Sequence, residues 1–97
     1  MSSFIFIYQA GSHPVPEDRI AENRAAWREW NTALNEDYGI RTSGGKVVTT
    51  DDVSDSDGTV RGASMVEFDS MDDAVAVARK SPNLTFGGSV EVLQEFA

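Results

Sequence analysis

The stretch SFIFIYQ at residues 3–9 decides the fold, because it reads as a β-strand that is apolar on both faces. Five of its seven residues are aromatic or β-branched, which favours a strand. Side chains alternate along a strand, so Phe4, Phe6 and Tyr8 share one face. Ile5 and Ile7 lie on the other face. We expect both faces of this strand to be covered.

The residues that follow, after a loop with two prolines, predict a helix over residues 16–38. Pro16 suits the first turn of a helix, and Gly39 is a plausible C-cap. Apolar side chains recur at steps of three and four residues, which makes one stripe along this helix. The stripe consists of Ile20, Trp27, Trp30 or Asn31, Leu34 and Tyr38.

The second half of the chain predicts two strands, a helix and a final strand. The strands are expected within residues 40–50 and over residues 59–68, with the acidic run 51–58 as the turn between them. The third strand offers the core Val60, Ala63, Met65, Val66 and Phe68. Ser70 is predicted to cap a helix that ends near Lys80, with inward residues Met71, Ala74, Val75 and Ala78. Pro82 prevents continuation, and a last strand is expected over residues 89–95.

This order of elements predicts one α+β domain over residues 1–97 with a ferredoxin-like βαββαβ topology. Two right-handed crossovers interleave into a four-stranded antiparallel sheet with both helices on one face. The other face stays open although the first strand is apolar on both sides. A second copy packed face to face would cover it, which predicts a homodimer. The alternative is a loop or tail of the same chain that closes this face.

Composition excludes several classes of partner and site. The chain has 16 acidic and 8 basic residues and a net charge of −8, which argues against nucleic acid and against an anionic membrane surface. We attribute the acidic charge to solubility, with steering of a cationic or neutral ligand as the alternative. The lack of cysteine excludes disulfides, thiolate metal sites and thiol nucleophiles. No signal peptide and no membrane span is recognised, so the cytoplasm is the expected compartment.

Several residues are candidates for a small-molecule site. His13, the single histidine, lies in a loop after the first strand, where an acid or base is often found. Trp27 and Trp30 lie one helical turn apart, and a pair of indoles suits the wall of an apolar pocket. Tyr8 lies on the first strand. The alternatives are that the histidine is simply exposed in its loop and that the tryptophans belong to the core.

Two charged residues of the third strand are further candidates. Arg61 and Glu67 share a strand face by their even spacing, and buried charges of this kind often mark a site. The alternative is two exposed surface charges. The aspartates of residues 51–57 do not match a calcium loop, because Val53 stands at the first ligand position. We therefore expect neither a metal nor a cofactor.

Short motifs along the whole chain resemble the YCII-related family, which includes the DGPF group. They are FIFIY at 4–8, AAWREW at 25–30, VEFDSMDDA at 66–74, Ser-Pro at 81–82 and GGSVEV at 87–92. The resemblance implies a small dimeric α/β barrel of ferredoxin-like topology with a pocket between helix, sheet and partner. The family is suggested to use a histidine early in the first helix together with an aspartate. This helix has no histidine, and Thr59-Val60 follows Asp57-Gly58 in place of Pro-Phe, so that chemistry does not carry over.

Two functions remain open at this point. The first is a dimeric domain that binds a small molecule without turning it over. The alternative is a cofactor-independent enzyme of the monooxygenase, isomerase or lyase kind, with His13, Tyr8, Arg61 and Glu67 as its polar groups. A third reading, an RNA-binding domain of the same topology, conflicts with the acidic charge.

Overall fold

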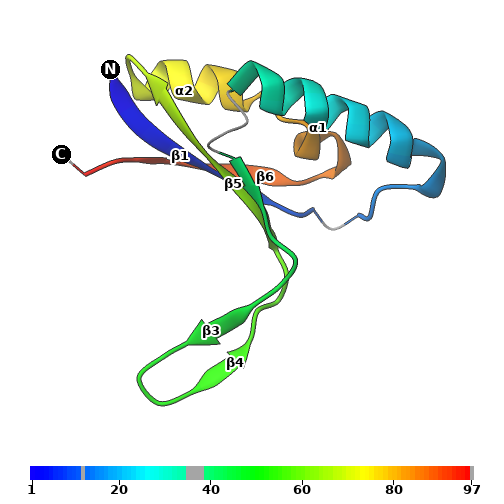
Figure 1. Cartoon of the computed structure of the whole chain (residues 1–97), viewed down its shortest axis with the longest axis vertical. Helices are drawn as coiled ribbons and strands as arrows, with labels where there is room; N and C mark the ends of the chain where they lie inside the picture. Colours follow the sequence, from blue (N-terminus) through cyan, green and yellow to red (C-terminus); the bar gives the residue numbers. More distant parts are fainter. Residues whose placement is uncertain (12, 35–38, 97) are drawn as a thin grey trace.

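The computed structural model describes residues 1–11, 13–34 and 39–96, and it has a layer of helices above a sheet with a hairpin below (Figure 1). The strands are β1 (Ser2–Gln9), β2 (Gly39–Arg41), β3 (Lys46–Val48), β4 (Val53–Asp55), β5 (Val60–Phe68) and β6 (Ser89–Gln94). The helices are α1 (Ile20–Leu34) and α2 (Met71–Ala78), with the 3₁₀ turns η1 (Glu17–Arg19) and η3 (Pro82–Phe86).

The main sheet has four strands in the order β2-β5-β1-β6, and every neighbouring pair is antiparallel. Both helices cover one face of this sheet (Figure 1). The α+β class and the four-stranded antiparallel sheet are thereby confirmed, and the strand order is consistent with the ferredoxin-like prediction. β3 and β4 form a separate two-stranded sheet.

The two faces of β1 have different surroundings. Phe4 and Phe6 are 1% and 0% exposed and form the centre of the core beneath the helices, together with Tyr8. Ile5 and Ile7 point to the opposite side. Ile5 stands between Met65 of β5 and Leu93 of β6, which are both exposed. Together with Ile40 of β2 these side chains make an apolar surface, called here the open face.

The first helix begins later than its sequence pattern predicts. Residues 17–19 form a 3₁₀ turn, and the α-helix runs from Ile20. Its predicted end at Tyr38 lies outside the described residues. Gly39 is not a helix C-cap; it is the first residue of β2 and pairs with Ser64. Trp30 is buried, whereas Ile20 is exposed because α1 meets the core through its second half.

The one strand expected within residues 40–50 is two strands in the structure, and the turn predicted over residues 51–58 is wrong at residues 53–55. Residues 40–50 divide into β2 and β3, and the acidic run contains β4, which pairs with β3. Lys46 faces Asp55 across the two strands and forms an ion pair with it. An opposite charge directly across the ladder stabilises an aspartate in a strand, and local propensity does not register that partner.

The second helix follows its prediction closely. The Ser70 Oγ accepts a hydrogen bond of 3.1 Å from the backbone N–H of Asp73, which confirms the N-cap. Ala74 and Ala78 are buried as expected. Met71 is instead partly exposed, and on β5 Val60 and Met65 are exposed, so these three do not belong to the core.

The strand alternation explains the exposure of Met65. Val66 points toward the helices, so its neighbour Met65 points to the open face.

Within the described residues, no helix combines the length and the hydropathy that a membrane crossing requires.

Candidate functional site

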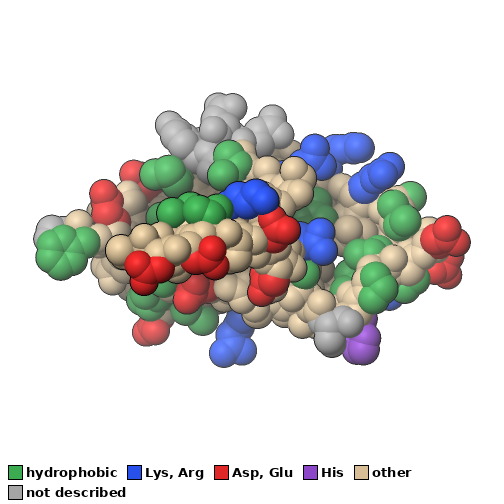
Figure 2. Space-filling model, turned by 90° about the horizontal axis from the view of Figure 1, so that it is seen from below, with side chains coloured by type: hydrophobic (Ala, Val, Ile, Leu, Met, Phe, Trp, Pro, Cys, Tyr) green, Lys and Arg blue, Asp and Glu red, His purple; other side chains and the backbone are tan. Residues whose placement is uncertain are grey.

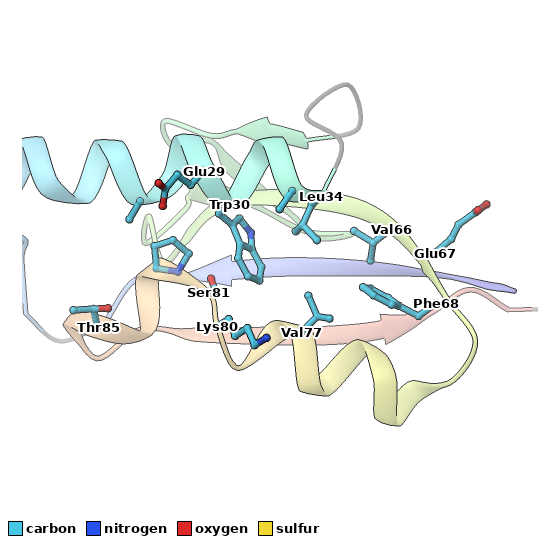
Figure 3. A pocket seen from close by; sticks show the side chains of 13 residues that line it. Glu29, Trp30, Leu34, Val66, Glu67, Phe68, Val77, Lys80, Ser81 and Thr85 are labelled. Atoms are coloured by element: carbon cyan, nitrogen blue, oxygen red, sulfur yellow. The ribbon is translucent and has the colours of Figure 1, made fainter.

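A groove of about 720 Å³ separates α1 from α2 on the helical side of the sheet (Figure 3). Its inner surface is apolar. The side chains that form it come from α1, β5 and α2, and they are Trp30, Leu34, Val66, Phe68 and Val77. The indole of Trp30 points from α1 toward the sheet and stands in the middle of the groove (Figure 3). The volume of the groove lies within the range of about 300–1,000 Å³ that is typical of ligand pockets, which are mostly apolar.

The rim of the groove carries polar groups from both sides. Glu29 comes from α1, and Lys80 follows α2, so charges of opposite sign stand on the two walls. Ser81 and Thr85 complete the rim at η3. The mouth of the groove therefore carries a carboxylate on one wall and an ammonium group on the other.

Hydrogen bonds fix the η3 wall of the groove to the sheet. The Asn83 Nδ2 donates to the carbonyl of Gln9 at 3.1 Å and to that of Ser89 at 2.8 Å. The buried Ser81 hydroxyl donates in turn to the Asn83 Oδ1. At the other side the Arg19 guanidinium lies 5.1 Å above the ring of Phe86, which links η1 to η3. These contacts tie η3 to the sheet and to η1.

A buried chain of polar groups lies behind the Trp30 indole. The Trp30 Nε1 donates to the Tyr8 hydroxyl at 2.9 Å. The Tyr8 hydroxyl and the Ser64 hydroxyl are 2.7 Å apart and share a second hydrogen bond. Because the Tyr8 oxygen already accepts from Trp30, the arrangement that satisfies every group has Tyr8 donating to Ser64. These hydrogen bonds fix the orientation of the Trp30 indole, which lines the groove.

Burial raises the pKa of the Tyr8 hydroxyl, and its hydrogen bonds with Ser64 and Trp30 only partly oppose that shift. The ring of Trp27 meets the Tyr8 ring edge-on, with centroids 5.0 Å apart and an angle of 82°. Tyr8 therefore stays a neutral hydroxyl at physiological pH. Its environment is that of a fixed hydrogen-bonding group and opposes use of the phenolate as a base.

The structure thus brings together three of the six residues that the sequence suggested: Tyr8, Trp27 and Trp30. The other three lie apart from them. His13 is exposed in the loop after β1, and its ring lies close to Gly87. Arg61 is exposed at a register shift in β5, six residues from Glu67. That spacing corresponds to about 20 Å along a strand.

Glu67 and Arg61 therefore do not form a buried polar pair. Glu67 borders the groove, but its carboxylate is exposed and points away from the other lining residues (Figure 3). Even spacing places two residues on one face of a strand and says nothing of their distance along it. Among the residues that the structure describes, no group of three or more His, Asp and Glu side chains is arranged to hold a metal ion.

Sequence reasoning missed Ser64, Lys80 and Asn83. Ser64 had a signal, because it stands on β5 between Gly62 and Val66 at an inward position, where a serine needs a partner. Lys80 was named only as the residue near which the second helix was expected to end. The part that Asn83 plays depends on carbonyls of β1 and β6, and no local pattern indicates those contacts.

The YCII-related domain family matches residues 1–95, which span every element from β1 to β6. The chain belongs to this family. No curated protein and no solved structure gives a significant match. The family resemblance of the sequence motifs is thus confirmed over nearly the whole chain. In this YCII-related chain the first helix presents Trp27 and Trp30 to Tyr8 and has no histidine among its described residues.

Proposed function

We propose that this YCII-related domain binds a small, largely apolar molecule in the groove between α1 and α2, acting as a homodimer without turning the ligand over. The observation that carries the proposal is the groove itself, with its volume of about 720 Å³, its apolar interior and its two opposite charges at the rim. Pockets with mostly apolar walls and a few placed polar groups are typical ligand sites.

The chemistry of the groove indicates the class of ligand. Trp30, Val66 and Phe68 favour hydrocarbon or an aromatic ring. Lys80 suits a carboxylate or another anionic group at the mouth, and Glu29 suits an amine or a hydroxyl. A ring or short chain with one polar end therefore fits better than a sugar or a nucleotide, which would meet too few hydrogen-bonding groups inside.

A binding role is favoured over catalysis because no acid–base pair faces the groove interior among the residues described. His13 is exposed elsewhere, Glu67 points outward, and the Tyr8 hydroxyl is held neutral by burial. General acid–base catalysis needs a group within hydrogen-bond reach of the reacting atom. A cofactor-independent enzyme is the alternative, and Trp30 with the hydroxyl behind it is the feature that such an enzyme would use.

The homodimer is supported by the open face. Met65 and Ile40 are 57% and 65% exposed, and they belong to one side of the same sheet as Ile5 and Leu93. A contiguous apolar surface of this kind is typical of an interface. Light scattering should give about twice the chain mass of 10.5 kDa. A monomer at 100 µM contradicts this part of the proposal.

The groove is tested with anilinonaphthalene sulfonate, a fluorescent apolar probe with an anionic group. Ala33 lines the groove, and Ala25 lies on the same helix outside it. The larger side chain of Ala33→Phe should fill the groove and weaken probe binding about fivefold or more. Ala25→Phe is the matched control and should leave the affinity unchanged. Equal binding by the two variants contradicts the groove as the site.

Mass spectrometry of any co-purified compound separates the two functions. Under the binding proposal the compound leaves the protein with its mass unchanged after prolonged incubation. A time-dependent change of mass, with many molecules converted per protein, supports the enzyme instead. In that case His13→Ala and Glu67→Gln show whether either side chain takes part, since loss of a general acid or base lowers turnover about 100-fold or more.

A further inference from the structure

The β3–β4 hairpin leaves the body of the domain and turns to the side of the open face, opposite the helices (Figure 1). It is joined to the sheet through residues 42–45 and 56–59, and each segment contains a glycine with positive φ. The Asp57 carboxylate accepts a hydrogen bond of 2.9 Å from the backbone N–H of Thr59, which lowers the pKa of Asp57 and shapes this bend. The hairpin and the open face are therefore inclined to each other (Figure 1).

The hairpin presents apolar side chains that nothing in its own chain covers among the described residues. Val48 and Val53 stand directly opposite each other and are 72% and 59% exposed. Val47 is exposed on the other side of the hairpin, and Val60 is exposed at the start of β5. Figure 2 views the molecule from this side, and hydrophobic side chains lie open there among charged ones. A two-stranded hairpin is marginally stable in water, so a ribbon that exposes valines is favoured where another surface covers it.

The area of the open face indicates what that surface is. Its four large apolar residues expose on the order of 350–400 Å² per protomer, whereas a stable homodimer interface contains roughly 500 Å² of apolar area per partner. The sheet alone falls short of that value. The directly opposed Val48 and Val53 of the hairpin add on the order of 200 Å², which brings the total above that value.

We infer that the β3–β4 hairpin is an arm that packs its Val48–Val53 side against a second copy of this chain. The inference rests on the proposed homodimer and adds a part to it. In a two-fold pair each copy fits into the angle between the open face and the arm of the other, so both arms are covered at once. The face with Val48 and Val53 is chosen because it pairs two valines, whereas Val47 stands opposite Ser54.

The experiment uses the full chain and three kinds of variant. Val48→Asp with Val53→Asp places charges on the contact side of the arm, and Ser54→Asp places one on its opposite side as the control. In a shortened variant, residues 44–59 are replaced by Asn-Gly. This is feasible because Thr42 already bonds to the carbonyls of Val60 and Arg61 across the β2–β5 ladder, and Asn-Gly closes such a ladder. Met65→Asp tests the open face itself.

Sedimentation equilibrium gives the dimer dissociation constant, and the near-ultraviolet signal of the core tryptophans shows that each variant is folded. We expect the double aspartate variant and the shortened variant to raise that constant about 100-fold or more, with less than about a threefold change for Ser54→Asp. Wild-type affinity in both arm variants together with dissociation of Met65→Asp overturns the arm and leaves the homodimer standing. A monomeric wild type at 100 µM overturns both.

Discussion

Removal of the Tyr8 hydroxyl is the sharpest test of the interior, because that one oxygen links α1 to β5. In Tyr8→Phe the Trp30 N–H keeps its buried position and loses its acceptor at 2.9 Å, and Ser64 loses its partner at 2.7 Å. A buried donor without an acceptor costs about 1–3 kcal/mol. We therefore expect the free energy of unfolding to fall by about 2 kcal/mol. In a domain of this size, that loss lowers the Tm by about 8–16 °C.

Urea unfolding followed by circular dichroism measures the loss, at one fixed protein concentration because association contributes to stability. Ser64→Ala and the double variant with Tyr8→Phe complete a cycle. Since the double variant removes both ends of one hydrogen bond, its cost should be smaller than the sum of the single costs by at least about 0.5 kcal/mol. A cost for Tyr8→Phe below about 0.5 kcal/mol, or strict additivity, refutes the hydrogen-bonded chain.

Three further predictions concern pH, a helix cap and the wall of the groove. The pKa of Tyr8 in the folded state is raised above its ordinary value of 10.0, so its contribution to the free energy of unfolding is complete below pH 10 and is lost as the pH rises further. Tyr8→Phe should therefore flatten the fall of the unfolding free energy above about pH 10, as measured by urea titrations. Ser70→Ala should lower the unfolding free energy by about 1 kcal/mol, and Ser70→Asp, which also caps, should restore most of it. Asn83→Asp turns a carboxylate toward two backbone carbonyls, so its Tm should lie below that of Asn83→Ala; the reverse order contradicts the assigned amide orientation.

The sequence predicted those features that depend on neighbours in the chain. The alternation of residues 3–9 and the cap at Ser70 need only local chemistry, and both are in the structure. The hairpin was missed for the opposite reason. Asp55 is a poor strand residue by itself, and its partner Lys46 lies nine residues away.

The site was predictable only in part. One strand and one helix brought Tyr8 to Trp27 and Trp30, because inward positions on adjacent layers must meet. For Glu67 and Arg61, the sequence pattern predicted a shared strand face, but it did not give the distance between them along the strand. The groove depends on the placement of α1, α2 and η3, and the hydrogen bonds of Asn83 tie η3 to carbonyls of β1 and β6 that no local pattern indicates.

The strand β1 lies between the groove proposed for a ligand and the face proposed for pairing. Its residues Phe4, Phe6 and Tyr8 face the helices, and Phe6 stacks with both Trp30 and Phe68 of the groove. Ile5 and Ile7 face away, next to residues of the open face. We therefore expect a change on one side of β1 to alter the groove through packed aromatic rings, and a change on the other side to alter the proposed association. Coupling between the two processes has to pass through the sheet, because close-packed layers transmit strain only where side chains shift together. The proposed dimer would thus stabilise a small core without covering the groove proposed for the ligand.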